Sequence, residues 1–188
     1  MDVRLRPFNR DDVAILQRFA ADPSAAGVFN WTGFRNPHAA LQRFDDDGLL
    51  SDEAGHLVIV ADGASVGAVQ WRSAGYDGVP AGSCWRIGCT VLPEHRGRGI
   101  GTAAHGQLVE YLLSTTPAVR IEADTQADNT AEQRCLERAG FTKEGVLRSV
   151  TFREGAWRDV IRYGLLRQEH LGDHRRDDKR SDPNTDRA

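Results

Sequence analysis

The stretch that decides the fold is His95-Arg96-Gly97-Arg98-Gly99-Ile100-Gly101, which runs directly into Thr102-Ala103-Ala104. Glycine weakens regular strands and helices, so three glycines at alternate positions mark backbone that something approaches more closely than a Cβ would allow. The residues after the loop predict a helix, and a helix that opens on glycines presents unpaired N–H groups at the positive end of its dipole. Arg96 and Arg98 add formal positive charge. The stretch therefore predicts an anion site whose usual occupant is phosphate.

Strand and helix patterns alternate on both sides of this loop. Apolar alternation or short apolar runs predict strands at residues 3–6, 56–61, 64–71, 85–92, 119–124, 146–152 and 157–165. Caps and a 3.6-residue period predict helices at residues 9–21, 38–46, 100–113 and 129–139. Asp62-Gly63 is a strong two-residue hairpin signal. We expect a mixed α/β domain with much antiparallel pairing, since the order is not a regular βαβ array.

Composition excludes several classes of protein. The chain has 188 residues, a formal net charge of −3, and no apolar run that approaches the ~20 residues needed to span a bilayer. Neither nucleic acid nor a membrane is therefore an expected partner. Three cysteines without a CxxC or HExxH pattern favour the reducing cytoplasm and no metal. Residues 172–188 hold no large apolar side chain, so we expect one domain over residues 1–171 and a disordered tail.

Three phosphate-binding motifs compete for the glycine loop. A Walker P-loop ends in Gly-Lys-Ser/Thr, and Gly101-Thr102 lacks the lysine, which excludes it. A dinucleotide fingerprint is closer, because acids follow ~20 residues later at Glu122 and Asp124. However, residues 93–96 separate the glycines from the preceding strand, and Thr102 stands where the third glycine belongs. A dinucleotide site stays open, as does a plain glycine-rich turn.

The third possibility is coenzyme A. Arg96-x-x-Gly99-x-Gly101 between a strand and a helix resembles the pyrophosphate motif of the GCN5-related N-acetyltransferases, the GNAT superfamily. The Asn-led segment at residues 129–141, which ends in Gly140-Phe141, resembles the second signature of that family. Residues 144–148, 157–159 and 163–166 resemble the closing hairpin of the RimJ/RimL-type branch, the ribosomal-protein N-terminal acetyltransferases. The resemblance spans about residues 3–169.

The resemblance implies a fold, a cosubstrate and a reaction. The fold is a twisted, mostly antiparallel sheet of about seven strands, flanked by helices, with a splayed strand pair that holds the coenzyme. The reaction is direct transfer from acetyl-CoA to a primary amine in a ternary complex. The oxyanion donor is a backbone N–H near Thr90 or Val91, for which we take Val91. A homodimer is a further expectation. The implied coenzyme-binding residues are Cys89, Val91, Leu92, Arg96, Gly97, Arg98, Gly99, Ile100, Gly101, Thr102 and Asn129.

The second signature also has a structural interpretation. Asn129 and Glu132 match a capping box, and Gly140 predicts a left-handed helix end on which Phe141 packs back. A carboxylate at position 132 would repel coenzyme phosphates if it pointed inward. We therefore expect Glu132 to cap the helix.

The groups that move protons are less evident. Glu122 lies on a predicted strand beside the coenzyme and is the candidate base, although a solvated or salt-bridged acid is the more common role. Relatives often carry a tyrosine general acid seven residues after the motif asparagine, where this chain has Leu136. Tyr76 or Tyr163 could replace it, or the thiolate could leave unassisted. An α-amine, with a pKa of ~8, demands less of a base than a lysine at ~10.4.

The acceptor is expected near an aromatic loop, with Trp31 and Phe34 as candidate contacts. Asp45, Asp46 and Asp47 would suit a cationic amine there, for example a protein N-terminus, a small amine or a basic antibiotic. Two alternatives stay open. In the first, Cys89 forms an acyl-enzyme with His95 as its base. In the second, the chain is a non-catalytic acyl-CoA sensor or interaction domain.

Overall fold

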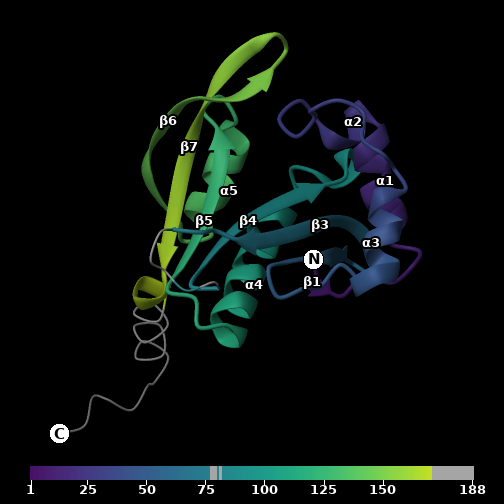
Figure 1. Ribbon diagram of the computed structural model, residues 1–188, viewed down its shortest axis with the longest axis horizontal. Coiled ribbons are helices and arrows are strands. Elements are labelled where there is room, and N and C mark those ends of the chain that lie inside the picture. Colours follow the sequence, from purple (N-terminus) through teal and green to yellow (C-terminus); the bar gives the residue numbers. More distant parts are fainter. Residues whose placement is uncertain (77–79, 81, 171–188) are drawn as a thin grey trace, which may run out of the picture.

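A computed structural model describes residues 1–76, 80 and 82–170. The expected tail at residues 172–188 lies outside this range. Seven strands form one sheet in the order β1-β2-β3-β4-β5-β7-β6 (Figure 1). The strands are β1 (Val3–Arg6), β2 (Ala54–Ala61), β3 (Ala64–Ser73), β4 (Cys84–Val91), β5 (Arg120–Gln126), β6 (Thr142–Arg153) and β7 (Ala156–Leu166). The helices are α1 (Val13–Ala21), α2 (Pro23–Ala26), α3 (Ala39–Asp47), α4 (Ile100–Thr115) and α5 (Thr130–Arg138), with a 3₁₀ turn η1 (Pro93–His95).

The predicted mixed α/β sheet is confirmed, and each predicted strand and helix is present. One helix was not predicted: α2 is four residues long, too short to show a period, and it begins where the Asp22 side chain accepts the Ser24 N–H at 2.8 Å. Residues 9–12 form a turn rather than the first helical turn, so α1 begins at Val13. Strand β6 starts at Thr142, earlier than predicted, because its first residues are exposed and lack an apolar pattern.

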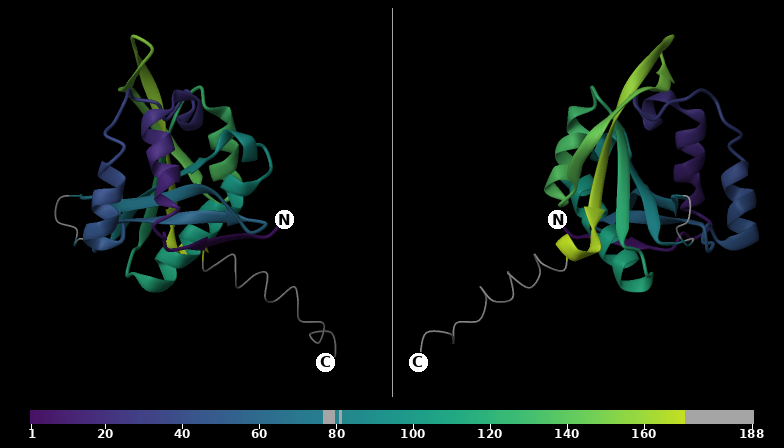
Figure 2. Two further views of the ribbon diagram at one scale, coloured as in Figure 1. Left: turned by 90° about the vertical axis from the view of Figure 1, so that its right-hand side faces the viewer. Right: turned by 60° about the vertical axis from the view of Figure 1, so that its left-hand side comes forward.

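The sheet separates its two hydrophobic cores by strand alternation. On β2, Leu57, Ile59 and Ala61 belong to the larger core with α4, whereas Val58 and Val60 belong to a smaller core with α1. The helices therefore cover opposite faces of the sheet, as the turned views in Figure 2 show. Within the described ranges, no helix combines the length and apolar content that a bilayer span requires.

The central strands β4 and β5 diverge partway along their length. They pair in parallel only from Cys84–Ile87 with Arg120–Ala123, and both strands then continue without pairing to each other. On its other edge β4 stays paired with β3 as far as Val91. The expected splayed strand pair is therefore present, and it opens a gap in the middle of the sheet (Figure 1).

Register determines which backbone groups of β4 face that gap. The Leu92 N–H donates to the Val66 carbonyl at 2.8 Å, which makes Val66 and Leu92 a hydrogen-bonded pair beside the β3–β4 ladder. Because such pairs alternate in antiparallel strands, the N–H groups of Cys89 and Val91 point away from β3. They point to the side on which β5 has already diverged.

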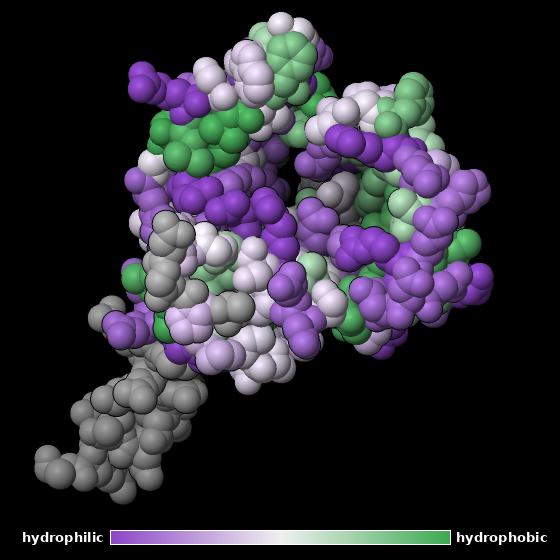
Figure 3. Space-filling model, viewed as in Figure 1, coloured by the Kyte–Doolittle hydropathy of each residue, from purple (hydrophilic) through white to green (hydrophobic). Residues whose placement is uncertain are grey.

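The final hairpin presents apolar surface. β6 pairs with β7 alone and is an edge strand. Val146, Val150, Phe152 and Trp157 on the hairpin are at least half exposed, and hydrophobic surface is visible over β6 in Figure 3. Homodimerisation stays a prediction.

Replacement of Gly67 by alanine tests the close approach of β3 to β4. A Cβ at Gly67 would lie 2.3 Å from the Thr90 carbonyl oxygen, which is backbone and cannot swing aside. Gly67→Ala should lower the free energy of unfolding by about 1–3 kcal/mol in urea titrations, the usual cost of overpacking. Gly106→Ala in α4 is the control, since nothing lies within 4 Å of its Cβ position. The control should be stabilised by up to ~1 kcal/mol because alanine favours helix. A Gly67→Ala protein as stable as the wild type would contradict this packing.

Candidate functional site

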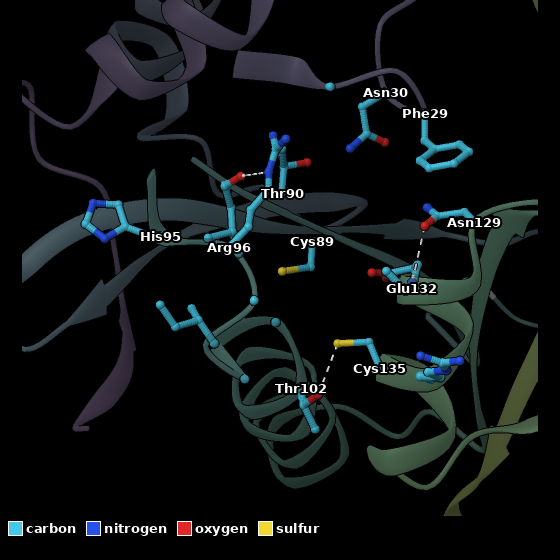
Figure 4. A pocket seen from close by; sticks show the side chains of 18 of the residues that line it. Phe29, Asn30, Cys89, Thr90, His95, Arg96, Thr102, Asn129, Glu132 and Cys135 are labelled. Atoms are coloured by element: carbon cyan, nitrogen blue, oxygen red, sulfur yellow. Dashed lines mark hydrogen bonds between the residues drawn. The ribbon is translucent and has the colours of Figure 1, made fainter. Parts of the chain in front are cut away.

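A cavity of about 540 Å³ lies between the glycine loop, the end of β4 and the start of α5. Residues 26–30 close its far side, and the close-up in Figure 4 shows the side chains that line it. Nine of the eleven expected coenzyme residues line this cavity: Cys89, Val91, Arg96, Gly97, Gly99, Ile100, Gly101, Thr102 and Asn129. The structure thus brings together residues from β4, the loop and α5.

The loop backbone adopts the conformation that its glycines permit. Gly97 has a φ of 74° and Gly99 a φ of 79°, a left-handed region that costs other residues energy. Gly99 is the N-cap of α4, and no side chain caps that end. The first N–H groups of α4 therefore have no capping side chain, which is the arrangement that suits an anion.

Three of the expected coenzyme residues have side chains engaged elsewhere. Arg96 lines the cavity, but it donates to the carbonyls of Val91 at 2.8 Å and Ala25 at 2.5 Å, so it ties α2 to the end of β4. Arg98 does not line the cavity and forms an exposed ion pair with Asp62 at 3.3 Å. Leu92 packs into the smaller core with α1.

Two arginines of α5 that were not predicted also line this cavity. Arg134 and Arg138 are four residues apart, so they lie on one side of the helix that Asn129 begins. That spacing was readable in the sequence, but without the fold nothing indicated which side of the helix faces the loop.

Helix α5 begins as expected, but Glu132 does not act as expected. The Asn129 side chain accepts the Glu132 N–H at 3.3 Å. The helix ends at Arg138, and Gly140, with a φ of 91°, turns the chain so that Phe141 packs back into the core. The Glu132 carboxylate, however, is 2.8 Å from Nε2 of the fully buried His105 on α4. The prediction that Glu132 completes a capping box is therefore wrong: its side chain partners a buried imidazole instead of the helix end.

His105, Glu132 and Cys135 form a compact cluster beside the cavity. One nitrogen, one oxygen and one sulfur of these residues lie within 4.8 Å of one another. Cys135 Sγ is also 3.1 Å from Thr102 Oγ1, and burial raises the pKa of this thiol. The expectation that no metal is needed stays a prediction.

Glu122, the candidate base, is fully buried in β5 among cations. It accepts from the Tyr76 hydroxyl, from Arg120 Nε at 2.8 Å and from Arg86 Nη2 at 2.9 Å. Burial opposes ionisation, but these hydrogen bonds and the charge of Arg162 outweigh it and lower the pKa of Glu122 to about 2. Glu122 lines neither the cavity described above nor the second cavity described below. Such surroundings favour an anchoring carboxylate, and a role in proton transfer stays an untested prediction.

The tyrosines considered as general acids lie outside both cavities as well. The hydrogen bond to Glu122 raises the pKa of Tyr76. Tyr163 is fully buried and donates to Glu137 at 3.0 Å, and burial first, then that bond, raises its pKa to about 12. Neither hydroxyl lines a cavity.

A second cavity, of about 610 Å³, continues along the splayed strands. We call it the acceptor cavity and the first the coenzyme cavity. Trp31 and Phe34 do not line it: their rings pack against each other at 5.1 Å, and Phe34 is 80% exposed. Phe29 and Asn30 of the same loop line it instead, because Gln126 on β5 holds the Phe29 carbonyl at 2.9 Å. Nothing in the sequence distinguished Phe29 from Phe34.

Charge in the acceptor cavity differs from the expected run of acids. Asp45, Asp46 and Asp47 do not line it, whereas Arg43 of the same helix does, together with Arg72, Arg86 and His56. The carboxylates that line this cavity are Asp124 and Glu132, so the expectation that the run Asp45–Asp47 lines it is not supported.

The two cavities meet at a shared set of residues. Six residues line both: Phe29, Asn30, Cys89, Thr90, Asn129 and Glu132. In Figure 4 these six lie around the open space beside the end of β4. Burial raises the pKa of the Cys89 thiol well above its ordinary value, which disfavours the thiolate that an acyl-enzyme mechanism requires.

Replacement of Glu122 by glutamine tests the anchoring role. A fall of the pKa from 4.5 to about 2 on folding corresponds to about 3 kcal/mol of stability at neutral pH. Because the folded pKa is the lower one, this stabilisation is present above the unfolded pKa and is lost as pH falls through 4.5 towards 2. Urea unfolding should show Glu122→Gln to be less stable than the wild type by about that amount at neutral pH, with the gap closing in acid. A gap of equal size in acid and at neutral pH would contradict the anchoring role.

Comparison with known proteins agrees with this geometry. The family model for the acetyltransferase (GNAT) domain matches residues 2–142. The uncharacterized N-acetyltransferase p20 of Bacillus licheniformis is 27% identical over 172 residues, which cover 89% of this chain and 94% of that protein. The putative ribosomal N-acetyltransferase YdaF of Bacillus subtilis is 29% identical over 155 residues, 82% of this chain and 78% of that protein. The solved structure of Mycobacterium smegmatis RimJ in complex with CoA-disulfide has a TM-score of 0.71 at 25% identity, with 89% of this chain and 83% of that chain covered. The chain therefore belongs to the GNAT family and is an N-acetyltransferase.

Proposed function

We propose that this enzyme transfers an acetyl group from acetyl-CoA directly to a primary amine while both substrates are bound. The pyrophosphate binds the amides of the glycine loop, and the pantetheine arm runs along the part of β4 that β5 leaves unpaired. The N–H groups of Cys89 and Val91 point to that side, and the Val91 N–H donates to the oxyanion. Arg134 and Arg138 add positive charge for the phosphates.

Two cavities that meet support direct transfer. A thioester in the coenzyme cavity and an amine in the acceptor cavity reach each other at the six shared residues. Holding both reactants at one junction replaces a bimolecular encounter by an effectively unimolecular step. An acyl-enzyme on Cys89 is not required, and its raised thiol pKa disfavours one.

We further propose that the acceptor is an α-amine with a negative charge nearby, such as the N-terminus of an acidic peptide. The observation that carries this choice is the charge of the acceptor cavity. Arg43 and Arg72 line it, and neither pairs with an acid among the described residues. Of the acids that line it, Asp124 pairs with Arg162 at 2.9 Å, and Glu132 forms a hydrogen bond with His105 at 2.8 Å. Unpaired arginines attract carboxylates and repel polycations.

An α-amine also demands the least of the catalytic machinery. Its pKa of ~8 leaves about a tenth of it neutral near pH 7, far more than a lysine side chain at ~10.4. A protein acceptor also agrees with the name of the relative YdaF, a putative ribosomal N-acetyltransferase.

Acceptor preference can be tested by CoA release. The peptide Ser-Asp-Glu-Leu should give a kcat/KM roughly tenfold above that of Ser-Arg-Arg-Leu and above those of spermidine and kanamycin, a difference of about 1.4 kcal/mol. The difference should shrink with added salt, since exposed charges are screened. Replacement of both Arg43 and Arg72 by glutamine should abolish the preference. Arg4→Gln, an exposed arginine outside both cavities, is the matched control.

Two outcomes would contradict the proposal. Fastest turnover of spermidine or kanamycin would overturn the acidic-peptide assignment. If the protein binds acetyl-CoA but releases no CoA in the presence of any of these amines, the sensor alternative would be favoured.

A further inference from the structure

We propose that Glu132 carries the reacting proton and that His105 is its positioning residue, an inference that rests on the function proposed above. Of the six residues that line both cavities, Glu132 is the one with a carboxylate. Cys89 is the other titratable residue in that set, and its raised pKa keeps it a thiol. The carboxylate therefore lies where the amine and the thioester must meet.

His105 is held in one position by its surroundings. It is fully buried on α4, its Nε2 is 2.8 Å from Glu132 Oε1, and its Nδ1 has no partner among the described residues. The bond to Glu132 is therefore the one side-chain hydrogen bond of this imidazole among the described residues. We assign its proton to Nε2, so that the imidazole donates to the carboxylate oxygen of Glu132.

This arrangement fixes the carboxylate from two sides. The Glu132 N–H is capped by the Asn129 side chain, which orients the start of α5. The His105 ring packs edge-on to Phe141 at 6.5 Å, so the imidazole is fixed as well. His105 lies between Ala104 and Leu108 on the core side of α4, where packing alone calls for an apolar residue. A histidine at this core position therefore indicates that its hydrogen bond to Glu132 has a functional role.

The proposed step balances without any further reactant. The neutral amine attacks the thioester carbonyl, forms the C–N bond and leaves an ammonium in the tetrahedral intermediate. Glu132 takes one N–H proton. The C–S bond then breaks, and Glu132 returns the proton to the departing sulfur to give CoA thiol and the amide. One proton moves from nitrogen to sulfur, so one carboxylate serves as base and then as acid.

Other groups around Glu132 do not compete for this role. The side chains that face it are His105 from α4, Cys89 from β4 and Cys135 from its own helix. Both thiols have raised pKa values and stay neutral. The earlier candidates Glu122, Tyr76 and Tyr163 lie outside both cavities.

Glu132→Gln is the direct test, because glutamine keeps the size and the acceptor oxygen but cannot take a proton. With acetyl-CoA and Ser-Asp-Glu-Leu, its kcat should fall roughly 100-fold or more, while the KM for acetyl-CoA stays within about threefold. Between about pH 8.5 and 9.5 the wild-type rate should be level, since an α-amine is then neutral. The residual Glu132→Gln rate should still rise there as hydroxide replaces the missing base.

The matched control is Glu137→Gln, on the same helix but outside both cavities, with its Tyr163 hydrogen bond preserved by glutamine. It should behave as the wild type. His105→Leu should lower kcat by about tenfold, and His105→Gln, whose amide can still donate to Glu132, should recover most of it. Calorimetric binding of acetyl-CoA by each variant shows that the fold is intact. Rates should be the same after EDTA treatment.

Each contrary outcome has one meaning. A kcat of Glu132→Gln within about threefold of the Glu137→Gln value would overturn the inference, as would a loss confined to acetyl-CoA affinity. Activity abolished by EDTA and restored by zinc would assign the cluster of His105, Glu132 and Cys135 to a metal instead. Wild-type protein that binds acetyl-CoA but acetylates none of the peptides would overturn the proposed function itself.

Discussion

The structure depends on the divergence of β4 and β5 after a short parallel ladder that ends at Ile87 and Ala123. Beyond that point the inner edge of β4 has backbone donors and no neighbouring strand, at the centre of a sheet that would otherwise be closed. The glycine loop follows at the end of the same strand, and α5 follows β5, so both halves of the coenzyme cavity derive from one split. Gly67 keeps β3 pressed against β4, and the arginines around Glu122 join β4, β5 and β7 where the strands are still paired. The β3–β4 contact and these ion pairs therefore fix the strands that border the gap.

The local features of this enzyme were predictable from its sequence. Glycine spacing, the cap at Asn129 and the terminator at Gly140 are each written within one short segment, so the glycine turn before α4 and the approximate ends of α5 could be predicted. Contacts between side chains from distant segments could not be predicted from the sequence. His105 and Glu132 are on different helices, and the period of each helix predicts a face but not its neighbour. The sequence placed Glu122 on the correct strand. It could not show the arginines that surround it, because they come from β4, β5 and β7. The aromatic loop was assigned to the acceptor, yet only the fold decides that Phe29 and not Phe34 lies inward.

The two cavities differ in the charged residues that line them. The coenzyme cavity combines glycine amides with Arg134 and Arg138, which supports the proposal of a phosphate-rich ligand. Arginines also line the acceptor cavity, and Arg43 and Arg72 among them pair with no acid of the described residues, which is why we propose an acceptor that brings its own negative charge. Glu132 lines both cavities, which is why we propose that its carboxylate meets the acyl end of the coenzyme.

Calorimetric titration of the full chain with acetyl-CoA, with NAD and ATP as controls, tests the central assignment most directly, because every later step requires the coenzyme at the glycine loop. We expect one site per chain with micromolar affinity for acetyl-CoA and no measurable heat with either control. Absence of acetyl-CoA binding at two temperatures, or a clear NAD signal, would contradict the coenzyme assignment and favour a dinucleotide site or a plain glycine turn.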